Sequence, residues 1–485
     1  MANDQNLNQN PAVPPQGSIS ANPTSSQSPV FSASLENPNV VTISGPPVKP
    51  LRKFVPGKNI IKIILGLIFV LIVISVVSFV VLPLFKENLS SKGAISYWGL
   101  WEDGKTMQVI ISDYESQNPG IKIDYSKQDI KQYRESITTR IENGSGPDIF
   151  TFHNTWYPMI SKVLLPFPND VISKEEFSKI FYPVAQKDLI KNGAIYGIPA
   201  EMDTLAMFVN TELFKSAGVS VPGTWNDFIS VARALTVKDE NGKIKTAGTA
   251  MGTYDNINHA PDILSLLFLQ NGVDLNDINT HRDRVEGALN FYTSFAKDTD
   301  NVWDDTLDPS LLAFSKGNLA MYFGYYWDYF SIKQFNPNLS FQIVPVPQLA
   351  DLQINLASYW ALGVSSNSKY QKQAFNFIKY FYSKDTQQKL YAQESKQRAF
   401  GEPYSRVDLA QSLSENPNVY PFVLQAPTAM SSLFVDSTYD NGLNQQLNTY
   451  LGNAVNSIYN GDSAESAFDA LSEGVSQVMQ QYGQQ

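Results

Sequence analysis

Hydrophobic and polar residues are distributed very unevenly along this chain, and the pattern divides it into three parts. Asn, Gln, Pro and Ser make up 28 of the first 50 residues. Such a stretch buries too little apolar area to offset the entropy of ordering, so we expect a disordered tail over residues 1–58. An uncharged apolar run, Ile63–Phe85, follows. At helical rise it spans about 35 Å, so we predict a transmembrane helix over residues 59–85.

The charges beside this run predict its orientation. Lys49, Arg52, Lys53, Lys58 and Lys62 precede it, with no acidic residue after Glu36. The more positive flank of a transmembrane helix stays in the cytoplasm. We therefore expect a cytoplasmic tail, a short polar linker over residues 86–93, and an extracellular or periplasmic body. A cleaved signal peptide is less favoured, because the run lies far from the amino terminus and no small-residue cleavage site follows closely.

The body, residues 94–485, begins as an alternation of strand and helix patterns. Short apolar strands are predicted at 94–98, 121–125 and 149–152, which predicts an α/β fold with a doubly wound parallel sheet. A body of this size suits two lobes rather than one core. The helices between these strands carry apolar residues at helical spacing, first Met107, Ile110, Ile111 and Tyr114, then Ile130, Tyr133, Ile137 and Ile141.

Two helix starts are predicted from capping residues. Asp129 is expected to cap the second of these helices. Near the carboxyl terminus, Asp462 and Glu465 are placed as a capping box for a helix that begins at Ala464.

Composition and motifs remove several classes of function. The chain has no cysteine, which excludes disulfides, Cys-ligated zinc, iron–sulfur clusters and thiol catalysis. Its net charge of −10 argues against nucleic-acid binding. No nucleophile elbow, P-loop or zinc motif occurs, and we expect neither a metal nor a cofactor. An acidic, cysteine-free exterior fits a bacterial envelope.

Five blocks of the body, in order, resemble the family 1 extracellular solute-binding proteins, the maltose-binding-protein-like subunits of ABC importers. The resemblance covers essentially all of residues 94–485. The blocks are Asn118–Ile123 with Gly144–Phe150 (GSGPDIF); Tyr196–Asp203 with Phe208–Asn210 and Leu213–Gly218; Thr224–Phe228; Ala313–Met321 with Pro345–Pro347; and the strand Trp360–Val364 before a helix at Ala374.

The resemblance implies a type II periplasmic-binding-protein-like fold, in which two α/β lobes close on a solute. It places residues of about 94–201 and 346–400 in the first lobe. The second lobe would hold residues of about 205–343 and 404–485.

Candidate binding residues follow from sheet geometry and from the resemblance. Ligands of parallel sheets sit beyond the carboxyl ends of the strands. Aromatic rings cover the C–H faces of a sugar, while carboxylates and amides pair with its hydroxyls. Trp98, Trp101 and Glu102 close the first strand, and Asn154 and Trp156 close the third. At the other lobe edges, and where the family often contacts sugar, lie Asp203, Asn256, Tyr326, Trp327, Tyr359 and Trp360.

The preferred interpretation is a membrane-tethered receptor that binds a sugar, oligosaccharide or polyol and delivers it to an ABC permease. A second is a solute-occupancy sensor that signals through a separate membrane partner. A third is a glycosidase that uses Glu102 and Asp203. Ferric iron, bound through Tyr325 and Tyr326, is a less favoured solute. A phosphorylated solute would need a cluster of Arg or Lys that the candidate loops lack.

Overall fold

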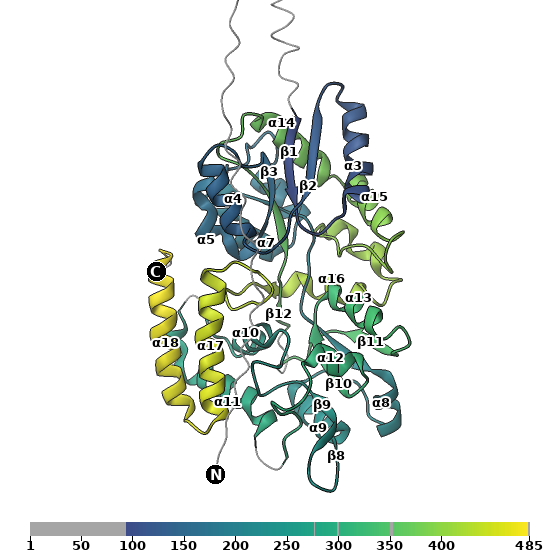
Figure 1. Ribbon diagram of the computed structural model, residues 1–485, viewed down its shortest axis with the longest axis vertical. Coiled ribbons are helices and arrows are strands. Elements are labelled where there is room, and N and C mark those ends of the chain that lie inside the picture. The colour runs from purple at the N-terminus through teal and green to yellow at the C-terminus, as the bar shows by residue number, and fades with distance from the viewer. Residues whose placement is uncertain (1–93, 276, 298–299, 350–352, 484–485) are drawn as a thin grey trace, which may run out of the picture. The chain divides into compact units, whose positions relative to one another are not determined.

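The computed structural model describes residues 94–275, 277–297, 300–349 and 353–483. The predicted tail, transmembrane helix and linker all lie outside the described residues. Within the described ranges, no helix is long and apolar enough to cross a membrane. These residues fold around two five-stranded sheets, each with its own hydrophobic core (Figure 1). The two-lobe α/β architecture predicted for the body is therefore confirmed.

The sheet of the first lobe has the strand order β2-β1-β3-β13-β6. β1 pairs in parallel with both β2 and β3, which confirms the doubly wound start. β13 returns to this sheet much later in the chain and runs antiparallel to β3. The strands are β1 Ala94–Gly99, β2 Lys122–Lys127, β3 Ile149–His153, β6 Ile198–Pro199 and β13 Trp360–Val364, with a small hairpin of β4 Ile190–Lys191 and β5 Ala194–Ile195 beside them.

Helices of the first lobe pack their apolar faces against this sheet. The predicted face of α3 is buried, and Asp103 caps the helix by accepting from the amides of Lys105 and Thr106. α4 begins four residues after the predicted cap. Asp129 accepts only from the amide of Lys131, and Gln132 precedes the helix with a left-handed backbone. The helices are α3 Gly104–Gln117, α4 Tyr133–Glu142, α5 Tyr157–Ile160, α6 Lys174–Ile180, α7 Pro183–Leu189, α14 Gln371–Phe381 and α15 Lys384–Glu394.

The sheet of the second lobe has the order β11-β7-β10-β9-β8. β7 runs antiparallel to both of its neighbours, whereas β9 and β10 are parallel. β7 and β10 are buried along their whole length, as central strands between helical layers should be. The strands are β7 Ala206–Asn210, β8 Val237–Lys238, β9 Ile244–Thr249, β10 Leu319–Gly324 and β11 Phe341–Val344; β12 Asn355–Leu356 pairs separately with β14 Ala429–Met430.

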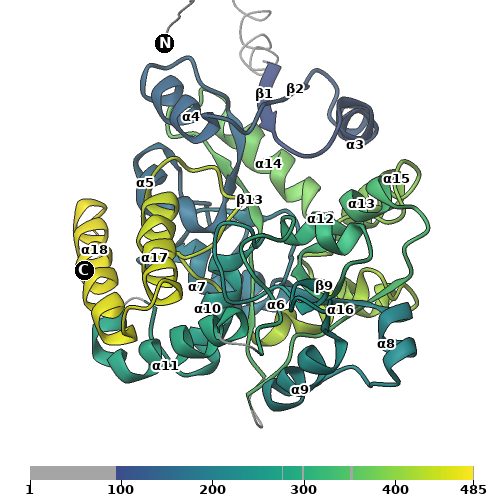
Figure 2. The same cartoon turned by 60° about the horizontal axis from the view of Figure 1, so that its bottom comes forward.

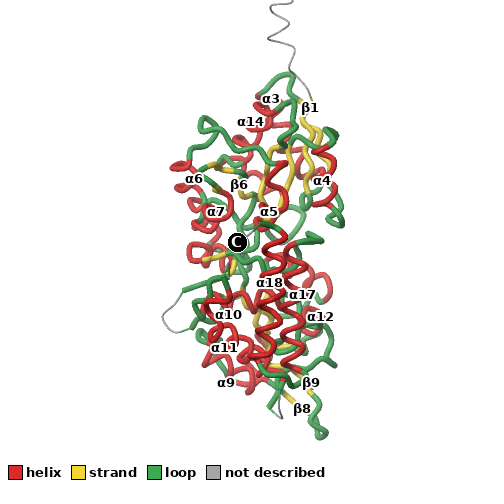
Figure 3. Tube along the Cα trace, turned by 90° about the vertical axis from the view of Figure 1, so that its left-hand side faces the viewer, coloured by secondary structure: helices red, strands yellow, loops and turns green. Residues whose placement is uncertain are grey.

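Helices of the second lobe include a long carboxyl-terminal pair. α17 and α18 lie side by side along α11 at one edge of the lobe (Figures 2 and 3). Ser463, rather than the predicted Asp462, caps α18 by accepting from the amide of Ser466. The helices are α8 Thr211–Ala217, α9 Trp225–Leu235, α10 Ala260–Gln270, α11 Arg282–Thr293, α12 Ser310–Ser315, α13 Tyr326–Phe335, α16 Tyr420–Gln425, α17 Leu443–Tyr459 and α18 Ala464–Gln481.

The chain crosses between the two sheets more than once. It leaves the first sheet after β6 and enters the second at β7, then returns between β11 and β13. It crosses again after α15, since Leu390 belongs to the first core and Phe400 to the second. Crossing segments of this kind bring strand ends from both lobes to a shared boundary.

Candidate functional site

A cavity of about 280 Å³ lies where residues of both lobes meet, and we call it the aromatic cavity. Five of its nine lining residues carry an aromatic ring. The others offer carboxylate, guanidinium and hydroxyl groups. The lining consists of Trp101, Glu201, Tyr326, Trp327, Trp360, Arg398, Glu402, Ser437 and Tyr439.

Strand topology places two tryptophans in the first-lobe wall. Trp101 follows the carboxyl end of β1. Trp360 opens β13, and because that strand is antiparallel to β3, it pairs with His153 at the carboxyl end of β3. The two indole rings meet edge to face with centroids 5.2 Å apart. Trp360 is 6% exposed and Trp101 37% exposed, so Trp360 is fixed in place and Trp101 presents its ring to solvent.

The start of α13 supplies two rings from the second lobe. The ring of Trp327 stacks on that of Tyr325, with centroids 4.6 Å apart and planes 20° apart. The backbone amide of Tyr326 donates to the Asp203 carboxylate at 3.1 Å, and its hydroxyl donates to Glu402 at 3.0 Å. Asp203 is fully buried. Its carboxylate therefore holds the first turn of α13 rather than facing the cavity.

A buried ionic network supports this aromatic stack from behind. His259 lies between the carboxylates of Asp328 and Asp436, at 2.9 and 2.8 Å. Burial lowers the pKa of His259, but the two carboxylates outweigh it and raise that pKa well above its usual value. The hydroxyl of Tyr325 donates to Asp262 at 2.5 Å. The network ties α10, α13 and the segment before α17 together beneath Trp327.

Carboxylates outnumber cations in the group around Arg398, which lies over the ring of Tyr326. The Arg398 guanidinium lies 3.3 Å from Glu394 and 3.5 Å from Glu402, which are both buried. Burial and the nearby Glu402 carboxylate raise the pKa of Glu394 to about 8. Burial and the charges of Glu402 and Glu394 likewise raise the pKa of Glu102. Glu201 accepts from the amide of Trp360 at 2.6 Å, and burial raises its pKa well above its usual value.

Among the residues that the structure describes, two groups of side chains have ligand atoms close enough together to hold a metal ion. They are His259 with Asp262 and Asp436, and Glu102 with Glu394 and Glu402. Each group already has a counter-charge. Both His259 nitrogens are used by carboxylates, and Arg398 bridges two of the three glutamates. In each group a cationic side chain of the protein already pairs with two of the carboxylates nearby.

Four of the eleven predicted binding residues line the aromatic cavity: Trp101, Tyr326, Trp327 and Trp360. Two more lie directly behind it, Asp203 beneath Tyr326 and Glu102 within the carboxylate group. Neither carboxyl group of the pair considered for glycoside hydrolysis lines the cavity.

The other five predicted residues are engaged elsewhere. Trp156 is fully buried behind Trp360, with ring centroids 5.3 Å apart. Asn154 and Tyr359 both donate to Asp188. Asn256 accepts from the Trp303 indole and donates to the carbonyl of Asp304. Trp98 is half-buried, with Arg140 over its ring.

Five lining residues were not predicted: Glu201, Arg398, Glu402, Ser437 and Tyr439. Glu201 lies two residues before Asp203, on the same crossing segment, so the family pattern pointed to its vicinity. Arg398 and Glu402 fall at the predicted lobe boundary near residue 400, where a cluster of charges was a usable signal. Ser437 and Tyr439 belong to the turn-rich sequence STYDNG, which carries no signal of its own for a ligand.

Comparison with known proteins gives both a family and a fold. The family model described as "Bacterial extracellular solute-binding protein" matches residues 98–388. The multiple sugar-binding protein of Streptococcus mutans is 25% identical over 333 residues, which cover 63% of this chain and 75% of that protein.

Solved structures with the same fold include the sugar-binding protein MalE of Xanthomonas citri, with a TM-score of 0.66 and 18% identity over 80% of this chain and 98% of that one. A cyclo/maltodextrin-binding protein solved with maltotetraose has a TM-score of 0.65 at 18% identity, over 80% of this chain and 97% of that one.

Proposed function

This chain belongs to the bacterial extracellular solute-binding proteins, and we propose that it is the carbohydrate-binding subunit of an ABC importer. The aromatic cavity carries the proposal. Its rings suit the apolar faces of a sugar, and its carboxylate, guanidinium and hydroxyl groups suit the hydroxyl edges. The sugar-binding relative from Streptococcus mutans supports the same class of solute. Because the walls come from both lobes, a bound sugar would favour their closed arrangement and present it to a permease.

A thermal-shift screen tests the proposal on the full chain, purified in a detergent without a sugar headgroup. The panel holds mono-, di- and oligosaccharides and polyols, with ferric citrate and glucose 6-phosphate as the alternative solutes. A ligand at a hundred times its dissociation constant adds about 2.7 kcal/mol of stability, which raises the melting temperature measurably. A rise with ferric iron or the phosphate alone would contradict the solute class, and no rise with any carbohydrate would contradict the function.

The variant Trp101→Ala locates the site. Trp101 is 37% exposed in the native protein, so removal of its ring should leave the fold intact. We expect affinity for the bound sugar to fall about tenfold, because a stacking face is lost. Phe335→Ala is the matched control, since Phe335 is 57% exposed and does not line the aromatic cavity. Equal affinity in the Trp101 variant would place the sugar elsewhere.

We also propose that the chain is anchored in the membrane by residues 59–85, with residues 1–58 in the cytoplasm. The apolar run and the basic residues before it support this topology. Tethering would keep the receptor close to its permease and raise its effective concentration there. Protease treatment of spheroplasts should digest the body and spare an epitope tag at the amino terminus. Digestion of the tag, or a protected body, would contradict the proposed orientation.

A further inference from the structure

Negative charge exceeds positive charge around the aromatic cavity. Among the residues that the structure describes, its lining holds the carboxylates of Glu201 and Glu402 and the guanidinium of Arg398. Two further carboxylates, those of Glu102 and Glu394, lie behind the lining, with oxygens within 4.8 Å of a Glu402 oxygen. Four carboxylates therefore stand beside one guanidinium, and the region carries a net negative charge when all of them are ionised.

The guanidinium of this region is already paired within the protein. Arg398 lies 3.3 Å from Glu394 and 3.5 Å from Glu402. Its guanidinium also lies over the rings of Tyr326 and Phe330, 5.8 and 5.2 Å from their centroids. These contacts hold it in one place, and its charge is paired with the two carboxylates that it touches.

Glu201 has an oxygen atom that no described residue uses. Its Oε1 atom accepts from the amide of Trp360 at 2.6 Å. Its Oε2 atom accepts no hydrogen bond from the described residues, yet it is not among the side-chain atoms that are fully buried without a partner. The residue as a whole is 4% exposed and lines the aromatic cavity. The Oε2 atom therefore opens onto that cavity, and a bound ligand is the partner within its reach.

The crossing segments place Glu402 next to Glu201. An antiparallel bridge pairs Glu201 with Tyr404, and the amide of Met202 donates to the carbonyl of Pro403 at 3.0 Å. Because side chains alternate along paired extended segments, Glu402 lies on the same side as Glu201. Burial and the charge of Glu402 raise the pKa of Glu201 well above its usual value. Two like charges therefore converge on the cavity, where a cation of the ligand would stabilise both.

The rings of the aromatic cavity suit a cation as well as the face of a sugar. Five aromatic side chains line it, and three of them are tryptophans. The face of an indole ring attracts an ammonium group, because the ring carries negative charge above and below its plane. An ammonium group in this cavity would be attracted by ring faces and by carboxylates together.

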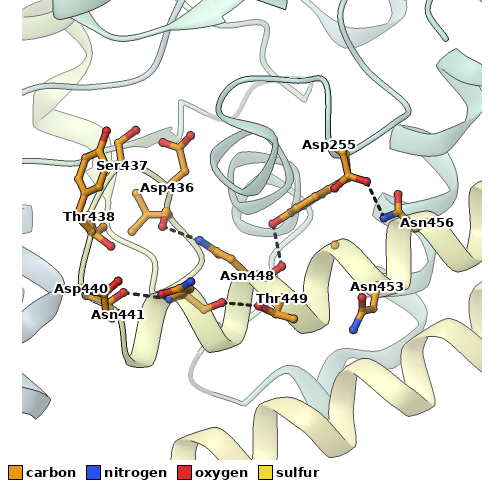
Figure 4. A pocket seen from close by; sticks show the side chains of 15 residues that line it. Asp255, Asp436, Ser437, Thr438, Asp440, Asn441, Asn448, Thr449, Asn453 and Asn456 are labelled. Carbon is orange, nitrogen blue, oxygen red and sulfur yellow. Dashed lines mark hydrogen bonds between the residues drawn. The ribbon is translucent and has the colours of Figure 1, made fainter. Parts of the chain in front are cut away.

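A neighbouring cavity carries charge of the same sign. Ser437 and Tyr439 also line this cavity of about 520 Å³, which lies beside α17 (Figure 4). Among the described residues, its lining contains no lysine or arginine but includes the carboxylates of Asp255, Asp436 and Asp440. Of these, Asp436 is already paired with His259. The charge of this part of the molecule therefore favours a cationic ligand and opposes an anionic one.

We propose that the solute is a sugar with a free, protonated amino group, and that Glu201 and Glu402 bind its ammonium while the tryptophan rings cover its faces. The inference rests on the proposed function and deepens it, since it names the charge of the carbohydrate. An N-acetylated sugar carries no charge at this position, and an acidic sugar carries the opposite one. Both should therefore bind more weakly than the amino sugar.

Calorimetry on the full chain tests the proposal at pH 6, where the amines are protonated. The probes are glucosamine, galactosamine, mannosamine and the β-1,4-linked dimer and trimer of glucosamine, each beside its neutral parent sugar and its N-acetylated form. Within the series that binds, we expect the amino sugar to bind about tenfold or more tightly than both neutral forms. EDTA is present throughout, because it removes divalent cations as another source of positive charge.

The variant Glu201→Gln isolates the effect of the carboxylate charge, since glutamine keeps an acceptor for the amide of Trp360. We expect the ratio of affinities between the amino sugar and its neutral parent to fall about tenfold in this variant. Glu201→Asp keeps the charge and should keep a preference for the amino sugar. Glu240→Gln is the control, because Glu240 is exposed in a surface turn, and its ratio should equal that of wild type. The comparison of probes on the wild type needs no variant, so it decides the proposal even where a variant fails to fold.

Two results would overturn the inference and leave the proposed function standing. One is a neutral or N-acetylated sugar that binds as tightly as its amino counterpart, or more tightly. The other is a preference for the amino sugar that Glu201→Gln leaves intact, since the ammonium would then lie away from Glu201. Failure of every carbohydrate to bind would instead contradict the proposed function, and this inference with it.

Discussion

At the residue scale, the carboxylates behind the aromatic cavity govern how the protein responds to pH. Glu394, Glu402 and Glu102 share a single nearby cation, the Arg398 guanidinium. One cation cannot balance three carboxylates out of water, and burial together with the neighbouring carboxylates raises the pKa of Glu394 and of Glu102. The Glu394 Oε1 atom is also buried and, among the described residues, accepts no hydrogen bond.

Replacing Glu394 by glutamine should stabilise the protein at alkaline pH. The folded-state pKa of Glu394 lies near 8, above the usual value for glutamate. The folded protein therefore binds this proton more tightly than the unfolded chain does. Stability from this group is complete below the usual glutamate pKa and is lost as the pH rises through about 8. Glutamine keeps the shape and has no proton to lose, so Glu394→Gln should unfold less readily at pH 9, by about 1–3 kcal/mol.

Urea unfolding at pH 5 and pH 9 measures this difference. Wild type should lose stability between the two conditions, and Glu394→Gln should lose less. Glu240→Gln is the control, because Glu240 is exposed in a surface turn and its replacement should not change the pH dependence. A variant with the same loss of stability as wild type would mean that Glu394 is already ionised at pH 5.

The predicted residues that line the aromatic cavity are those whose position follows from topology or from the family pattern. Trp101 follows from the rule that the carboxyl ends of the strands of a doubly wound sheet form its ligand edge. Trp327 and Trp360 follow from the family resemblance, which places Trp360 just before a strand that re-enters the first lobe. Trp156 obeys the same strand-end rule yet is fully buried, because η2 Asn154–Trp156 turns its ring behind Trp360. Sequence position therefore identified the edge of the sheet but not the direction of each side chain.

At the element scale, helices were predicted well and their starts less well. Apolar spacing located α3 and α4, since α3 buries the face that the pattern indicated and α4 buries Tyr133, Ile137 and Ile141 of its own pattern. Which residue caps a helix depends on the backbone angles of that one residue. Ser463 and Asp462 are both good capping residues in sequence, and only the fold selects Ser463. α4 has no side-chain cap at all, so its first residue could not be located from a capping signal.

Two helical glycines should respond to alanine in opposite ways. In α18, a Cβ atom at Gly474 would overlap the ring of Tyr450, on the neighbouring α17. In α11, a Cβ at Gly287 would have only the Asn271 amide near it, at 3.9 Å. Alanine is better than glycine in a helix interior by about 1 kcal/mol. Gly287→Ala should therefore gain about that much, whereas Gly474→Ala should lose about 1–3 kcal/mol by overpacking the helix pair.

Thermal unfolding of both variants provides the check, with each glycine serving as the control for the other. Equal stabilisation by the two substitutions would mean that α17 and α18 can separate at no cost, and would contradict the close packing of this pair.

At the scale of the whole molecule, chain length and local patterns predicted two α/β lobes but not how the lobes divide the chain. Periodicity reads only local order, and it found the first sheet because β1, β2 and β3 are close in sequence. The return of β13 to that sheet, some two hundred residues later, is a long-range pairing that only the family resemblance indicated. Arg398, Glu402, Ser437 and Tyr439 also reach the aromatic cavity through contacts with residues that are distant in sequence.

A contact that joins the two lobes without touching the ligand should change the affinity for every ligand by the same factor. The Arg134 side chain on α4 in the first lobe donates to the carbonyl of Asp440, in the segment before α17, at 2.6 Å. Arg134 does not line the aromatic cavity. Losing a hydrogen bond from a charged donor weakens the arrangement it stabilises by about 1.5–3 kcal/mol, and a ligand that favours this arrangement must then supply the difference.

We therefore expect Arg134→Gln to weaken short and long sugars by the same factor, about tenfold, rather than to weaken only the long ones. Arg284→Gln is the matched control, because Arg284 also donates to a backbone carbonyl, that of Gly272 at 2.7 Å, but within one lobe. Calorimetry with a short and a long member of the same series separates the two effects. A loss confined to the longer sugar in Arg134→Gln would assign this residue to the ligand site, and unchanged affinity for both would mean that the contact persists whether or not sugar is bound.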